Sequence, residues 1–210
     1  MAPSPSRLSY ELRKANTEDM QRRRWMIGLS YVGIGAGMIV GLYQTGILRR
    51  LPDLPFPPFD ATKVDKAPYA YKRLQTPDAL LMIASYGVTA ILAGAGGKNR
   101  AKENPALPVA MAAKALYDLG VALKLGQEEW RENRALCGYC QAATVASLVS
   151  VGVAMPEAVK AVRHVLSGDF GDARRSQARR PVTEEDRERS RRQPKHYTRP
   201  LKGQQPVHAH

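Results

Sequence analysis

Residues 25–48, WMIGLSYVGIGAGMIVGLYQTGIL, form an uninterrupted run of 24 residues without a charged side chain. A helix rises about 1.5 Å per residue, so this stretch is long enough to cross a hydrocarbon core of about 30 Å. Residues 79–97 form a second uncharged block. A third block, 105–123, is interrupted by only two charged residues, and a fourth, 135–156, is again uncharged. The sequence therefore predicts an all-α membrane protein, a four-helix transmembrane bundle with helices at about 25–48, 79–97, 105–124 and 135–156.

The segments around this transmembrane domain, residues 25–158, differ from it in composition. Residues 1–24 form a polar arm. The connection 49–78 contains LPDLPFPPF at residues 51–59, whose four prolines exclude a regular helix and predict a stiff, Pro-rich extra-cytoplasmic loop. Residues 159–210 are basic and contain few apolar groups, so we expect a largely disordered tail.

The net charge of +13 is distributed unevenly along the chain. Lys and Arg number 22 in the amino-terminal arm, the second connection and the carboxyl-terminal segment, against 9 in the other two connections. The positive-inside rule then predicts a multi-pass protein of the plasma (inner) membrane with both termini in the cytoplasm. We expect the basic tail to bind anionic lipid headgroups, and the tail offers no aromatic platform for specific nucleic-acid binding.

Glycines recur at four-residue spacing in the first helix, at Gly33, Gly37 and Gly41. Small residues at this spacing let a neighbouring helix approach closely in a membrane. The neighbour is either another helix of the same chain or the same helix of a second copy.

A CxxC motif stands at the start of the fourth predicted helix. Cys137 and Cys140 are the two cysteines of the sequence. Zinc and iron-sulfur sites use four ligands, and haem attachment requires a histidine where Gln141 stands, so we predict no metal. A helix start stabilises a thiolate, which favours redox chemistry. A structural disulfide, or a thiol pair that only packs, is the alternative.

The segment CGYCQAATVAS at residues 137–147, followed by Pro156, Glu157 and Ala158, resembles the vitamin K epoxide reductase family, particularly its bacterial members. The resemblance covers about residues 20–160. It implies a helix bundle around a quinone, ubiquinone or menaquinone, with the first loop capping the site. It also implies that Cys137, the outer and more accessible thiol, exchanges disulfides with the electron donor.

The resemblance further implies that Cys140, one turn deeper, faces the quinone. Many family members carry a second cysteine pair in the first loop, and this chain has none in residues 49–78. Either a thioredoxin-like dithiol protein reduces the membrane pair directly, or the reductant is something other than a protein.

Helical spacing places four residues of the fourth helix on one stripe: Cys137, Cys140, Thr144 and Ser147. Thr144 is therefore a candidate hydroxyl donor to a quinone carbonyl, at the position where the family has such a donor. Alternatively, its hydroxyl bonds back to the carbonyl of Cys140.

Two charged residues lie within the third predicted helix, Lys114 and Asp118, one turn apart. Asp118 is expected at a depth similar to that of Cys140, where it is a candidate to pass the proton that accompanies quinone reduction. The alternative is a pair that only neutralises itself.

Together these features predict a membrane thiol:quinone oxidoreductase that passes electrons from a dithiol partner through a CxxC disulfide to a quinone. One alternative is a non-catalytic membrane scaffold or complex subunit with a structural disulfide. Another is a four-helix thiol-redox protein that uses no quinone.

Overall fold

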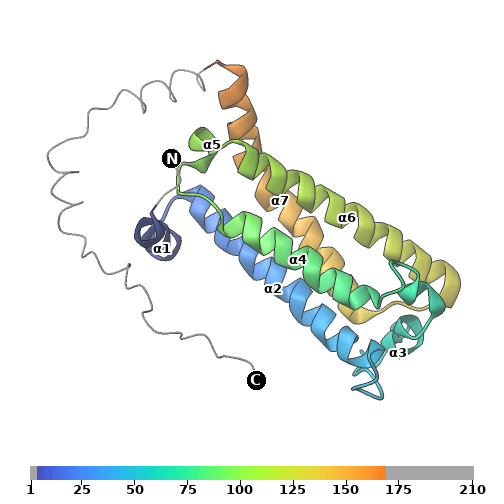
Figure 1. Ribbon diagram of the computed structural model, residues 1–210. Coiled ribbons are helices and arrows are strands. Elements are labelled where there is room, and N and C mark those ends of the chain that lie inside the picture. Colours follow the sequence, from blue (N-terminus) through green and yellow to red (C-terminus); the bar gives the residue numbers. More distant parts are fainter. Residues whose placement is uncertain (1–3, 169–210) are drawn as a thin grey trace, which may run out of the picture. The chain divides into compact units, whose positions relative to one another are not determined.

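The computed structural model describes residues 4–168. All regular secondary-structure elements in this range are helices (Figure 1). Phe59 and Leu136 add one isolated β-bridge. The prediction of an all-α protein is therefore confirmed for this part of the chain. In chain order the helices are α1 (Pro5–Lys14), α2 (Glu18–Gln44), α3 (Ala61–Asp65), the 3-10 helix η1 (Pro68–Tyr71), α4 (Asp78–Gly94), α5 (Arg100–Glu103), α6 (Ala106–Asn133) and α7 (Gly138–Leu166).

Four of these helices pack around a common interior (Figure 1). Helix α2 contacts α4 and α7, and α6 contacts the same two helices. Helices α2, α6 and α7 are long and apolar enough to cross a membrane, whereas α4 is apolar but has only 17 residues. The chain is thus a membrane protein, and the crossing by all four helices stays a prediction.

The helix ends differ from the predicted bounds in both directions. Helix α2 ends at Gln44 instead of 48, and α4 ends at Gly94 instead of 97, whereas other ends lie beyond the predicted apolar blocks. Helix α2 begins before residue 25, α6 runs to Asn133 instead of 124, and α7 runs through Pro156 to Leu166. Residues 159–166, which were expected to begin the tail, are therefore helical, and the tail from residue 169 lies outside the described part. The lack of charge marks only the portion suited to hydrocarbon, whereas Glu, Gln, Lys and Arg extend a helix readily.

The glycine face of α2 packs against α4. A Cβ atom added at Gly33 would lie 2.4 Å from the ring of Tyr86, and one at Gly37 would lie 2.9 Å from Ile83. At Gly35 an added Cβ would meet nothing within 4 Å. Of the two neighbours that the spacing allowed for this face, the structure has the intramolecular one.

We expect Gly33→Ala to destabilise the protein by about 1–3 kcal/mol, because the added methyl group must displace a buried ring. Gly35→Ala is the matched control, since it makes the same change on the same helix in open space. Thermal unfolding in detergent micelles measures both. Equal unfolding midpoints for the two variants would contradict the packing described.

Two buried arginines hold the connection between α4 and α6. Arg23 is 1% exposed and donates hydrogen bonds to the backbone carbonyls of all five residues 93–97, at 2.7 to 3.2 Å. Arg100 forms a two-pronged ion pair with Glu157 of α7, both contacts at 2.8 Å, and donates to the carbonyl of Leu92. The carbonyls left open at the end of α4 are thereby satisfied, and α4 is tied to α2 and α7.

We expect Glu157→Gln to lower the free energy of unfolding by about 3 kcal/mol, because it leaves the buried Arg100 guanidinium without its counter-charge. Lys160→Ala on the same helix breaks an exposed ion pair with Asp19. This control should change the free energy of unfolding by less than about 1 kcal/mol. Unfolding in mixed detergent micelles provides the comparison. Similar small losses in both variants would show that the buried pair does not hold the bundle.

Candidate active site

The two cysteines lie where the α6–α7 connection enters α7. Cys137 has an extended backbone and is the N-cap residue, and its sulfur accepts a hydrogen bond from the backbone N–H of Cys140 at 3.4 Å. Cys140 occupies the first turn of the helix. Both are free thiols in the structure, and their sulfurs lie within 4.8 Å of each other. A disulfide between them therefore requires only a small adjustment.

The surroundings of the two thiols differ. Cys137 is fully buried, because the chain between α2 and α4, residues 45–77, folds over the start of α7. We call these residues the covering segment. Backbone hydrogen bonds join this segment to Leu136, whose carbonyl accepts from Asp60 and whose N–H donates to Pro58. The outer thiol, expected to be the more accessible one, is thus the covered one in this conformation. The buried side chains of this segment that cluster with it are Leu51, Ala61, Val64 and Tyr69.

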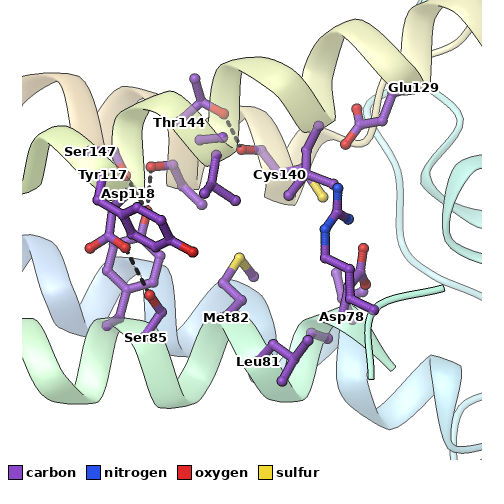
Figure 2. A pocket seen from close by; sticks show the side chains of 18 of the residues that line it. Asp78, Leu81, Met82, Ser85, Tyr117, Asp118, Glu129, Cys140, Thr144 and Ser147 are labelled. Atoms are coloured by element: carbon purple, nitrogen blue, oxygen red, sulfur yellow. Dashed lines mark hydrogen bonds between the residues drawn. The ribbon is translucent and has the colours of Figure 1, made fainter. Parts of the chain in front are cut away.

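Cys140 lines a cavity of about 540 Å³ between α4, α6 and α7. Figure 2 shows Cys140 in the cavity wall, with Leu81 and Met82 of α4 across from it. The volume lies within the range of small-molecule sites, and most of the surrounding side chains are apolar. A flat apolar ring such as a quinone head is the kind of ligand that these walls suit.

Hydroxyl groups of α4 and α7 supply polar positions in the cavity wall. Thr144 donates a hydrogen bond to the carbonyl of Cys140 at 2.9 Å, and its oxygen retains capacity to accept (Figure 2). The hydroxyls of Tyr86 and Ser147 lie 2.7 Å apart, and Tyr86 donates to the carbonyl of Ala143. The predicted stripe thus faces the cavity from Cys140 onward, with Cys137 lying under the covering segment instead.

Asp118 is in the same wall and is fully engaged by hydrogen bonds. The Lys114 ammonium lies 2.5 and 2.6 Å from its two carboxylate oxygens, and the hydroxyls of Ser85 and Thr89 donate one bond to each. The predicted pair therefore exists, and Asp118 shares the cavity with Cys140. This geometry fits a neutralised pair, so a proton-passing role for Asp118 stays a prediction.

Glu129 is a site residue that the sequence analysis did not identify. It is 2% exposed, lines the cavity, and accepts hydrogen bonds from the backbone N–H of Cys137 at 3.2 Å and from Gln141 at 3.4 Å. Figure 2 places it toward the opposite end of the cavity from Asp118. The apolar block predicts a helix that ends at about 124, which places Glu129 in a connection, whereas α6 continues to Asn133. Continuing the helical spacing from Asp118 through Leu125 would have revealed it.

Asp65, the last residue of α3, is a second residue that was not identified. One of its carboxylate oxygens lies within 4.8 Å of both cysteine sulfurs, although Asp65 is 72 residues away from Cys137 in the sequence. No periodic signal in a five-residue helix could have pointed to it. The three groups supply one ligand fewer than a closed zinc site uses, and we interpret the cluster as thiol chemistry.

The helices, the dithiol and the adjoining cavity define a class, a membrane protein with a CxxC pair beside a site for a small apolar molecule. The family model described as the vitamin K epoxide reductase family matches residues 24–155, and the chain belongs to this family. No curated protein and no solved structure matches the chain. The family consists of membrane oxidoreductases that act on quinones. Its matched range includes both cysteines and the cavity walls.

Proposed function

We propose that this protein is a thiol:quinone oxidoreductase in which Cys137 and Cys140 carry the electrons. The observation that supports this most directly is the place of Cys140, in the wall of a 540 Å³ apolar cavity and within 4.8 Å of the second sulfur. A scaffold disulfide would need no such cavity beside it.

The reaction has two halves. A donor thiolate attacks the sulfur of Cys137 and breaks the Cys137–Cys140 disulfide, and the second donor thiol then displaces Cys137. The donor leaves as a disulfide, and the pair is left as the dithiol. In the second half the pair closes its disulfide again and passes two electrons to the quinone, which becomes a quinol with two protons. The sum is dithiol plus quinone to disulfide plus quinol.

The donor in this proposal is a thioredoxin-like dithiol protein outside the cytoplasm. No cysteine in residues 49–78 is available to relay electrons, so the donor reacts with Cys137 itself. Because Cys137 is fully buried, the covering segment moves before the donor reaches this sulfur. The bonds of Leu136 to this segment open in that step.

The quinone, ubiquinone or menaquinone, occupies the cavity with its ring beside Cys140. Its carbonyls meet the polar positions of the wall, of which Thr144 is the nearest along α7 to the reacting sulfur. To donate to the quinone, the Thr144 hydroxyl turns away from the carbonyl of Cys140, to which it donates a hydrogen bond in the structure. Asp118 is the candidate for passing a proton at the far end.

The two cysteines should respond differently to substitution. We expect Cys140→Ala to abolish quinone reduction while Cys137 accumulates a mixed disulfide with the donor. Cys137→Ala should abolish both reduction and capture. Ser150→Ala, a buried change on the same helix outside the cavity wall, is the control and should retain activity. Quinol formation and mass spectrometry of trapped adducts are the measurements.

Retention of quinone reduction in both cysteine variants, with equal losses of stability, would remove the enzyme and leave a scaffold with a structural disulfide. A mixed disulfide without any quinone reduction by the wild-type protein would instead indicate a thiol-redox protein that uses another acceptor.

We place both termini in the cytoplasm and the protein in the plasma (inner) membrane, on the Lys and Arg excess of 22 against 9. The bridge between Phe59 and Leu136 joins the first and third connections at one end of the bundle, as expected if both connections lie on the same side of the membrane. The basic residues after Pro156 bind anionic lipid headgroups in this arrangement, although those from 169 onward lie outside the described part.

We expect a reporter that is active only in the cytoplasm to be active when it is fused after His210. The matched fusion for the opposite side inserts the same reporter after Asp53, in the first connection, and should give the reverse result. A carboxyl-terminal reporter active outside the cytoplasm would overturn the topology and the donor assigned above.

A further inference from the structure

The carboxylate of Asp65 is buried beside the dithiol, and one of its oxygens has no hydrogen-bond partner among the described residues. Asp65 is 2% exposed, and the oxygen without a partner is Oδ2. A carboxylate oxygen of the same residue lies within 4.8 Å of both cysteine sulfurs. Burying an unpaired polar atom is unfavourable, so a residue chosen for stability alone would not be an acid here.

Burial and the groups that face Asp65 set the pKa of its carboxyl group. These groups are the thiols of α7, Glu129 of α6, Asp78 of α4, Asp53 of the covering segment and Tyr69 of η1. Burial and, to a smaller extent, the three acidic neighbours raise the pKa of Asp65 to about 7, against the opposing effect of a hydrogen bond from Cys137. The carboxyl group therefore gains or loses a proton within the working range of a cell.

We propose that Asp65 is a catalytic proton acceptor for the dithiol, taking the Cys137 proton as the disulfide forms and returning it as the disulfide is reduced. This inference rests on the proposed function and adds a residue to it. Glu129 is less suited to the role, because its carboxylate already accepts bonds from the backbone of Cys137 and from Gln141.

The protons and electrons balance over the cycle. On oxidation a sulfur–sulfur bond forms, two electrons pass to the quinone, and the Cys137 proton goes to the Asp65 carboxylate. The quinone takes one proton from Cys140 and one from the medium. On reduction the donor dithiol supplies two electrons and two protons, Asp65 returns its proton, and one proton is released to the medium.

The protonation of Asp65 is then linked to the redox state of the pair. In the dithiol the hydrogen bond from Cys137 favours the ionised carboxylate, and a disulfide has no hydrogen to donate. The pKa of Asp65 is about 7 in the dithiol, and we expect it to be higher in the disulfide, where this hydrogen bond is lost. Between these two pKa values, reduction releases one proton, so rising pH favours the dithiol.

The test is the equilibrium of the full-length protein with dithiothreitol in detergent, without quinone, across pH 6 to 8.5. Dithiothreitol exchanges two electrons and two protons, so an uncoupled cysteine pair gives an equilibrium constant independent of pH. For the wild-type protein we expect the constant to rise toward the dithiol above pH 7, by up to about tenfold per pH unit. Acid quenching and thiol alkylation measure the fraction reduced.

Asp65→Asn should give a constant that does not change with pH, because the amide carries no proton to release. Asp65→Glu should restore the rise. Asp60→Asn is the matched control, since it makes the same change at the exposed cap of the same short helix, where Asn caps equally well. Its constant should follow that of the wild-type protein. Unfolding midpoints of all variants show whether each is folded, and Asp65→Glu carries the test if Asp65→Asn is not.

A pH-independent constant in the wild-type protein, or an unchanged rise in folded Asp65→Asn, would overturn the role of Asp65. Neither result bears on quinone reduction, which is measured separately. Conversely, the equilibrium constant could rise with pH in a protein that never reduces a quinone. That result would support the proton coupling of Asp65 and contradict the proposed function. In single turnover, Asp65→Asn should slow quinone reduction by about 100-fold at pH 7.5.

Discussion

The five hydrogen bonds from Arg23 to the carbonyls of residues 93–97 fix how the helices lie against one another. A helix that ends at a membrane surface leaves carbonyls that need donors, and here one guanidinium from α2 supplies them for α4. The Arg100–Glu157 pair extends the connection to α7. These contacts fix the position of α4 along its two neighbours. In this position Tyr86 donates a hydrogen bond to the carbonyl of Ala143, and the apolar side chains of α4 lie across from Cys140.

The opposite end of the bundle is closed by the covering segment, and several of the polar contacts that attach this segment are exposed to solvent. The segment over Cys137 is attached by a short bridge and by bonds such as those from Tyr139 to Pro52 and from Lys63 to Asn133, both at exposed positions. Such contacts open at a lower free energy than a buried ion pair. The buried arginines hold the α4 end beside the cavity, and opening of the exposed contacts at the other end would give the access that Cys137 needs in the proposed cycle.

The covering segment contributes carboxylates to the site instead of cysteines. With no thiol in residues 49–78, it carries no electrons, yet it brings Asp65 to within 4.8 Å of both sulfurs. Glu129 approaches the same pair from α6 through the backbone of Cys137. In the proposed cycle the segment therefore manages the protons of the dithiol, while the external donor brings the electrons directly to Cys137.

An all-helical membrane protein with a CxxC pair could be predicted from the amino-acid sequence, and so could the candidates Cys140, Thr144 and Asp118, which all line one cavity. These follow from charge-free length and from spacing along single helices, which are local properties. The cover over Cys137 and the approach of Asp65 and Glu129 to it depend instead on how distant segments pack together. Asp65 lies on a five-residue helix far away in the sequence, and Glu129 lies beyond the apolar end of α6. Periodicity defines a face of one helix, whereas the partner of that face is set by packing between distant segments.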